Sequence, residues 1–154
     1  AVMLAVQGGF PVKITSLTDG RYGIAASPTS KAEKLADLAG KQIGMSSNSV
    51  IHYMVDTLMA AAGVPAAEIN LLPIPKMPVR LESMLAGQFA AAGMPEPVLT
   101  TARVRGARII ATTDDYGLGA ADLSRAAAWL GSKGLLKSAI VQAALLDPRP
   151  IEGF

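Results

Sequence analysis

The stretch that decides the fold runs from residue 37 to residue 113, reading DLAGKQIGMSSNSVIHYMVDTLMAAAGV from Asp37, IPKMPVRLESMLAGQFAAAGMPEP from Ile74 and GARIIATT from Gly106. Short apolar runs typical of strands alternate here with longer helical patterns that end at glycine or bend at proline. Because regular alternation of strands and helices favours a largely parallel sheet covered on both faces, we expect an α/β fold.

The apolar spacing also places the individual elements. We expect strands at residues 12–17, 22–26, 42–45, 70–73, 89–93 and 108–112. We expect helical segments at residues 1–7, 30–38, 50–62, 65–68, 78–86, 97–104 and 121–130. Ser30 is the expected N-cap of the second helical segment, with Glu33 as its capping-box partner.

Composition excludes several classes of protein. The 154 residues are 51% hydrophobic and 17% charged, which suits a globular chain with a real core. Its 14 basic and 12 acidic residues are scattered, so we predict no nucleic-acid partner. The absence of cysteine removes disulfides and thiolate metal sites. No apolar run reaches membrane-spanning length, and the first ten residues, AVMLAVQGGF, lack the basic leader of a signal peptide.

Four polar residues, Ser46, Ser47, Asn48 and Ser49, separate the expected strand at 42–45 from the next helix. One interpretation is ordinary helix capping, because these side chains accept hydrogen bonds from backbone N–H groups. The other is an anion site, since a helix start at the carboxyl end of a strand is where open α/β sheets bind ligands. The sequence leaves both interpretations open.

Other polar residues carry similar alternatives. His52 and Asp56 are four residues apart and form either a solvated surface pair or a group that faces a ligand. Glu96 either stabilises a helix start or accepts a hydrogen bond from a ligand. Lys76 and Arg80 are either exposed basic residues or part of an anion site. No catalytic or nucleotide-binding motif is present, so we predict no catalytic residue, no cofactor and no metal site.

Four phrases together carry a family resemblance: PVKITSL with YGIAASP, the segment from Asp37 to Val64, PIPKMPVRLESMLAGQFAAAGMPEP, and RGARIIATTDD. Their order resembles the second lobe of substrate-binding proteins of ABC importers, in the nitrate, sulfonate, taurine and thiamine-precursor group with the type II periplasmic-binding-protein-like fold. In that family two α/β lobes close over a small molecule. The implied ligand contacts are Ser46 to Ser49 and the Met94–Glu96 bend, together with Thr18, Asp19 and Tyr22. His52 is a further candidate contact from its place in the helix.

The resemblance also implies a division of the chain. Residues 1–29 correspond to a partial first lobe, 30–115 to the second ligand-binding lobe, and 116–154 to a C-terminal return to the first lobe. Segments of the first lobe before residue 1 and after residue 117 are not matched. A truncated gene, an engineered minimal lobe and a longer protein are the open alternatives. Self-association through the incomplete lobe is a further expectation.

The function implied by the resemblance is transport. We expect a non-catalytic solute-binding component that captures a small anionic or heteroaromatic ligand in an interlobe cleft and delivers it to an ABC transporter permease. Such a protein is periplasmic or anchored at the cell surface. The alternatives are an enzyme similar to those of thiamine-pyrimidine biosynthesis and the effector-sensing domain of a transcription regulator.

Overall fold

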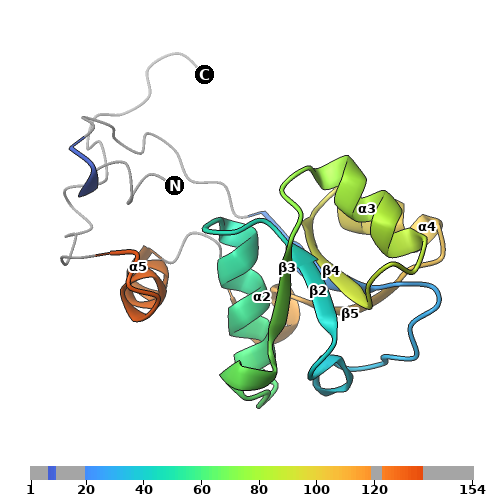
Figure 1. The fold of residues 1–154 in the computed structure, drawn as a ribbon, viewed down its shortest axis with the longest axis horizontal. Coiled ribbons are helices and arrows are strands. Elements are labelled where there is room, and N and C mark those ends of the chain that lie inside the picture. Colours follow the sequence, from blue (N-terminus) through green and yellow to red (C-terminus); the bar gives the residue numbers. More distant parts are fainter. Residues whose placement is uncertain (1–6, 10–19, 119–122, 137–154) are drawn as a thin grey trace. The chain divides into compact units, whose positions relative to one another are not determined.

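The computed structural model describes residues 7–9, 20–118 and 123–136 (Figure 1). The chain divides into two compact units, of which one comprises residues 20–119 and the other residues 1–19 with 120–154. The expected helix at 1–7 lies almost wholly outside the described residues, and the expected strand at 12–17 lies entirely outside them.

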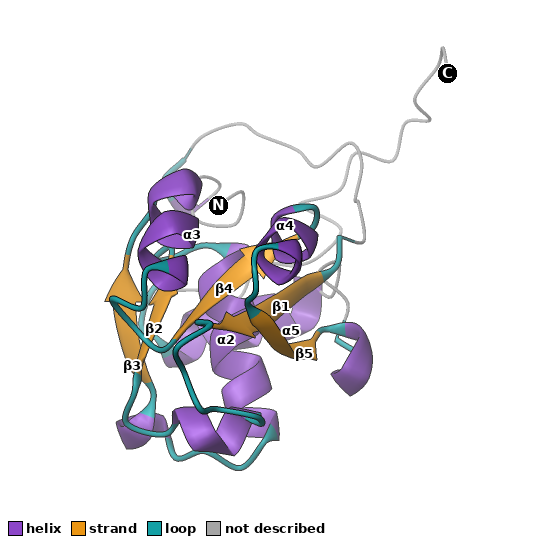
Figure 2. Cartoon of the chain, turned by 90° about the vertical axis from the view of Figure 1, so that its right-hand side faces the viewer, coloured by secondary structure: helices purple, strands orange, loops and turns teal. Residues whose placement is uncertain are grey.

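A five-stranded sheet forms the centre of the 20–119 unit. Its strands are β1 (Tyr22–Ala26), β2 (Gln42–Met45), β3 (Asn70–Pro73), β4 (Ala91–Pro95) and β5 (Arg108–Thr112). They lie in the order β3-β2-β4-β1-β5 (Figure 2). β2 pairs in parallel with β3 and β4, whereas β1 runs antiparallel to both β4 and β5. Four strands therefore point the same way, which confirms the mostly parallel sheet.

The strand predictions hold closely, apart from β4. The bounds of β1, β2, β3 and β5 are those predicted, whereas β4 begins two residues later than expected. Phe89 and Ala90 instead connect the preceding helix to the sheet, where Ala90 donates its N–H to Gln42 O and accepts from Ser27 N–H. Phe89 is nevertheless buried. Its apolar side chain led the sequence pattern to predict a strand residue, although Phe89 lies outside β4.

Helices cover both faces of the sheet, as expected (Figure 2). The helices are α2 (Val50–Ala61), α3 (Met77–Leu85) and α4 (Val98–Val104). Side chains of α2 pack with Ile24 and Ala91 in one apolar cluster. Side chains of α3 and α4 pack in a second cluster with Ala25 and Ala92, the next residue of each strand. This alternation is the period of two that a strand buried on both faces requires.

The expected helix over residues 30–38 is shorter than predicted. Only Leu35–Leu38 is helical, as a 3₁₀ turn. Ser30 and Glu33 do not form the expected capping box. The carboxylate of Asp37 accepts hydrogen bonds from the N–H groups of Glu33 at 2.9 Å and Lys34 at 3.1 Å. A carboxylate satisfies exposed backbone donors more strongly than a serine hydroxyl, so Asp37 fixes where this turn begins.

The compact unit begins earlier than the expected lobe boundary between residues 29 and 30. β1 belongs to the sheet because its backbone pairs with β4 on one side and with β5 on the other. Its inclusion moves the start of the unit to residue 20. The division into a first lobe at residues 1–29 and 116–154 and a second lobe at residues 30–115 stays a prediction.

The described part of the other unit contains helix α5 (Leu123–Ser132), close to the expected helix at 121–130. Leu130 is buried, as expected for an inward position. The helix is followed by Gly134, whose φ of +67° is the left-handed conformation common at helix ends. Gln7 donates its side-chain amide to Leu135 O at 3.1 Å, which joins two distant parts of the sequence within this unit.

Candidate functional site

The carboxyl ends of β2, β3 and β4 lie at one edge of the sheet, because these strands are parallel neighbours. β1 runs the other way, so its first residue, Tyr22, reaches the same edge opposite Pro95. Glu96 donates its backbone N–H to Arg21 O at 2.9 Å. The structure thus brings Tyr22, the Ser46–Ser49 loop and Glu96 to one edge of the sheet, the kind of place where open α/β sheets bind ligands.

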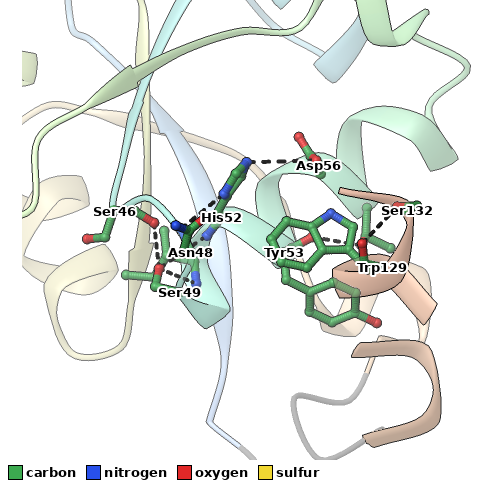
Figure 3. Close-up of polar contacts among 10 residues, drawn as sticks. Ser46, Asn48, Ser49, His52, Tyr53, Asp56, Trp129 and Ser132 are labelled. Carbon is green, nitrogen blue, oxygen red and sulfur yellow. Dashed lines mark hydrogen bonds and ion pairs between the residues drawn. The ribbon is translucent and has the colours of Figure 1, made fainter. Parts of the chain in front are cut away.

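Ser49 is the N-cap of α2, as the capping interpretation required. Its hydroxyl accepts from the N–H groups of Ile51 at 3.2 Å and His52 at 3.4 Å, and donates to Ser46 O at 2.7 Å (Figure 3). Two backbone donors at the helix start are therefore already bound. An anion at this edge needs other donors. Of the four polar residues, Ser47 and Asn48 are exposed and Ser46 is half-buried, so their side chains are the available donors.

His52 and Asp56 form a pair that is largely shielded from solvent. Their side chains are 13% and 10% exposed, so the expectation of a solvated pair is wrong. Asn48, whose φ is +55°, donates its N–H to His52 Nδ1 at 3.2 Å. Because Nδ1 accepts this bond, the proton of the neutral ring is on Nε2, which lies 3.9 Å from Asp56 Oδ2 (Figure 3). The ring therefore holds the loop against α2.

Arg80 overturns the expectation of an exposed basic residue, because it is fully buried. Its Nε and Nη2 donate to Ile74 O at 2.9 and 2.7 Å, and its Nη1 donates to Gly93 O at 2.8 Å. Nη2 also donates to Ser46 Oγ. One guanidinium thus joins the segments at the carboxyl ends of β2, β3 and β4. Lys76, by contrast, is exposed as expected.

The Met94–Glu96 bend divides into a buried part and a surface part. Met94 is fully buried in the apolar cluster beneath α3 and α4, so its side chain has no exposed surface, and its ligand contact stays a prediction. Glu96 is half-buried, and its carboxylate accepts from Thr100 N–H at 3.0 Å at the start of α4. This contact is the helix-start role that the sequence allowed. The second carboxylate oxygen makes no hydrogen bond to any described residue.

Tyr22 is half-buried at the site edge, with its backbone N–H donating to Thr113 Oγ1 at 3.3 Å. Thr18 and Asp19 lie outside the described residues, so their ligand contacts stay predictions. Sequence reasoning missed Thr113, which is buried, and the exposed ion pair between Arg21 Nη2 and Asp114 Oδ2 at 2.6 Å. The polar run after the strand at 108–112 was the signal for both.

A cavity of about 570 Å³ lies away from these residues. It is lined by Ser27, Ser30, Arg103 and Arg108 among others. Ser27 follows the carboxyl end of β1 and Arg108 begins β5, so the cavity is at the opposite edge of the sheet. None of the predicted site residues contributes to it. The described residues hold no cluster of metal-ligating side chains, and no helix among them has the length and apolarity to cross a membrane.

Comparison with solved structures defines the class of fold. The alkanesulfonate-binding protein SsuA from Xanthomonas axonopodis pv. citri, bound to MOPS, is 21% identical with a TM-score of 0.63. The periplasmic aliphatic sulphonate binding protein SsuA from Escherichia coli is 17% identical with a TM-score of 0.65. The fold is that of periplasmic binding proteins. Residues 1–120 match the NMT1/THI5-like family, and the chain belongs to that family.

Both alignments cover 87% of this chain but 50% of the relative, so the chain spans about half the length of these proteins. The same fold occurs in an enzyme, since the desulfurization enzyme DszB is 15% identical with a TM-score of 0.53. Its alignment covers 74% of this chain and 46% of the enzyme. No match was found among curated protein sequences.

Proposed function

We propose that the chain is the solute-binding component of an ABC import system, or the greater part of one lobe of it. It captures a small anionic or heteroaromatic molecule without catalysis. The observation that carries this proposal is the convergence of Tyr22, Ser46, Ser47 and Glu96 on one edge of the sheet. Edges of this kind are where open α/β sheets bind ligands.

The remaining parts of the proposal follow from the family and the fold. The ligand occupies an interlobe cleft, with Thr18 and Asp19 among its predicted contacts, and His52 contributes from the helix start. The loaded protein delivers the molecule to an ABC transporter permease, and it works in the periplasm or at the cell surface. Self-association through the incomplete lobe belongs to the same proposal.

The test is a binding screen on the purified protein by isothermal titration calorimetry. The panel contains aliphatic sulfonates, carboxylates, nitrate and aminopyrimidines. We expect one-to-one binding of at least one compound, weakened at least tenfold by Tyr22→Ala. Thr57→Ala is the control, because its hydroxyl bonds to Tyr53 O within α2. Binding that is unchanged in Tyr22→Ala would place the site elsewhere, and no binding at all would remove the solute-binding proposal.

An enzyme similar to those of thiamine-pyrimidine biosynthesis is the second candidate, because the desulfurization enzyme DszB shares the fold. Product formation from a bound sulfinate or pyrimidine, followed by mass spectrometry, distinguishes it from a binding protein. A sensory domain of a transcription regulator is the third candidate. A DNA-binding domain encoded in the same gene would favour a regulatory function over transport.

A further inference from the structure

Arg80 is a buried cation whose hydrogen-bond partners are all uncharged. The side chain is fully buried, and its four hydrogen bonds go to two backbone carbonyls and one serine hydroxyl. Ion pairs among the described residues join Arg21, Arg105 and Arg108 to carboxylates, but none includes Arg80. A buried charge is ordinarily balanced by a charge of opposite sign. The positive charge of Arg80 lacks such a balance within the described part of the chain.

The charge persists despite its burial. Loss of hydration lowers the pKa of Arg80 from its ordinary value. An arginine guanidinium nevertheless stays protonated in proteins, because its ordinary pKa is far above neutrality. The three oxygen dipoles around it stabilise the cation only in part. An anion placed nearby therefore gains electrostatic energy in surroundings from which water is largely excluded.

Ser46 connects this charge to the surface. Arginine has no acceptor, so in the bond between Arg80 Nη2 and Ser46 Oγ the serine oxygen must accept. The hydroxyl proton of Ser46 is then left to donate elsewhere, and no described residue accepts it. Ser46 is half-buried, so its hydroxyl proton is left for an acceptor bound at this edge of the sheet. A donor polarised by a cation behind it prefers a charged acceptor over a neutral one.

The sequence around Arg80 leaves room for this arrangement. Gly44 lies in β2 just before Ser46, and a Cβ built on it would lie 3.2 Å from Arg80 Cγ and 2.7 Å from the Phe89 ring. The absence of a side chain at Gly44 therefore lets Arg80 cross beneath β2 to reach Ser46 and Gly93. The packing of three elements around Arg80 buries its side chain. Arg80 therefore differs from a surface arginine whose side chain only lies back against the protein.

We propose that Arg80 is the positioning residue that makes this site select a small organic oxoanion, acting through the Ser46 hydroxyl. The inference rests on the proposed function and narrows its ligand class from anionic or heteroaromatic molecules to anions. The anionic headgroup lies at the carboxyl ends of β2 and β4 and accepts a hydrogen bond from Ser46. Arg80 does not touch the ligand. A neutral heteroaromatic molecule at the same place leaves the buried charge without compensation.

The test measures selectivity for charge, which loss of a merely structural contact would not change. The probes are ethanesulfonate, the nearly isosteric but neutral ethanesulfonamide, and a neutral aminopyrimidine, each titrated into the purified protein by calorimetry. We expect the native protein to bind ethanesulfonate at least tenfold more tightly than either neutral probe. We expect Ser46→Ala, which keeps the carbonyl contacts of Arg80, to reduce that ratio at least fivefold.

Two further variants separate charge from shape. Arg80→Lys keeps a cation and should retain part of the preference, whereas Arg80→Met should abolish it, with folding checked by circular dichroism. Ser83→Ala is the control. It makes the same serine-to-alanine change at a residue of α3, and it should leave the ratio of the two affinities unchanged. If Arg80→Met does not fold, the Ser46→Ala ratio decides.

The outcomes distinguish the two proposals. An unchanged ratio in Ser46→Ala overturns the role of Arg80. If the native protein binds ethanesulfonamide or the aminopyrimidine as tightly as ethanesulfonate, the solute-binding function stands and the anion inference fails. If it binds no probe and no compound of the wider panel, the solute-binding function itself fails and the inference fails with it.

Discussion

At the scale of single residues, the approach of α2 to the sheet depends on Gly93. A Cβ at this position would lie 2.4 Å from Val55 Cγ2 and 3.0 Å from Ile51 Cγ2, both on α2. A contact of 2.4 Å essentially never occurs between real carbon atoms, so a side chain here would push the helix outward. The same backbone segment gives its carbonyl to Arg80. Gly93 therefore supports the packing of one face and the polar edge at once.

We predict that Gly93→Ala destabilises the fold by about 1–3 kcal/mol, the usual cost of overpacking a core. Urea unfolding followed by circular dichroism measures this loss as a lower midpoint with an unchanged slope. Gly131→Ala is the matched control, because no atom lies within 4 Å of a Cβ built there and the residue is in α5. That variant should be neutral or slightly stabilising. Equal midpoints for Gly93→Ala and the native protein would contradict the packing argument.

Arg80 shows why part of the site escapes sequence reasoning. Because arginine is usually exposed, the sequence near Lys76 and Pro78 favoured an exposed position for Arg80. Its actual partners, Ser46 and Gly93, are 34 and 13 residues away in the sequence. Only the fold brings their oxygens together. Ser49 was easier to assign, because capping is a contact between residues that are neighbours in sequence.

At the scale of elements, the strands were more predictable than the short helical turns. β2 and β3 are apolar runs bounded by turn residues, a signal that depends on local sequence alone. The turn at Leu35–Leu38 is different, since two capping patterns competed and the contact made by Asp37 prevailed. The polar edge was predictable as a place, because it follows from the parallel strands, but the long-range hydrogen bonds of Arg80 were not.

We predict that Ser49→Ala costs about 1 kcal/mol of stability, because two N–H groups at the start of α2 lose their acceptor. Ser49→Asp should recover most of the loss, since a carboxylate also caps a helix and interacts favourably with its dipole. Thermal unfolding of the three proteins gives the comparison. A Ser49→Asp variant as unstable as Ser49→Ala would show that the hydroxyl bond to Ser46 O, and not capping, is what matters.

A second prediction at this scale concerns pH. Hydrogen bonds from the N–H groups of Glu33 and Lys34 lower the pKa of Asp37 from its ordinary value of 3.8. Its stabilising contribution is therefore complete above that value and is lost as the pH falls through the lower pKa of the folded state. Asp37→Ala should be less stable than the native protein at neutral pH, and the difference should shrink below pH 3.8. A difference independent of pH would exclude an effect of the charge.

At the scale of the whole molecule, residues 20–119 contain a complete sheet and its hydrophobic core. Their sheet is covered on both faces by two apolar clusters, and its core residues come from within the unit. Domains with a core of their own generally fold alone. The site edge also belongs to this unit, apart from the predicted contributions of Thr18 and Asp19.

We predict that residues 20–119, expressed alone, unfold in urea in one cooperative transition. Circular dichroism and tyrosine fluorescence should report the same midpoint. Gly93→Ala within this shorter protein should lower the midpoint as it does in the 154-residue chain. A gradual loss of signal without a transition would mean that the unit depends on the remaining residues for its fold.

The pairing of Tyr22 with Thr113 has a consequence for engineering. Thr113 donates its N–H to Tyr22 O at 2.8 Å, so one hydrogen bond joins the backbone near the beginning of the 20–119 unit to the backbone near its end. A unit with adjacent ends can be inserted into a surface loop of an unrelated host without stretching that loop. The unit is also suited to circular permutation. Its ends would be joined by a short linker, and new termini would be opened at Gly63, which is exposed after α2. We therefore expect that residues 20–119 can be inserted as a unit into another protein.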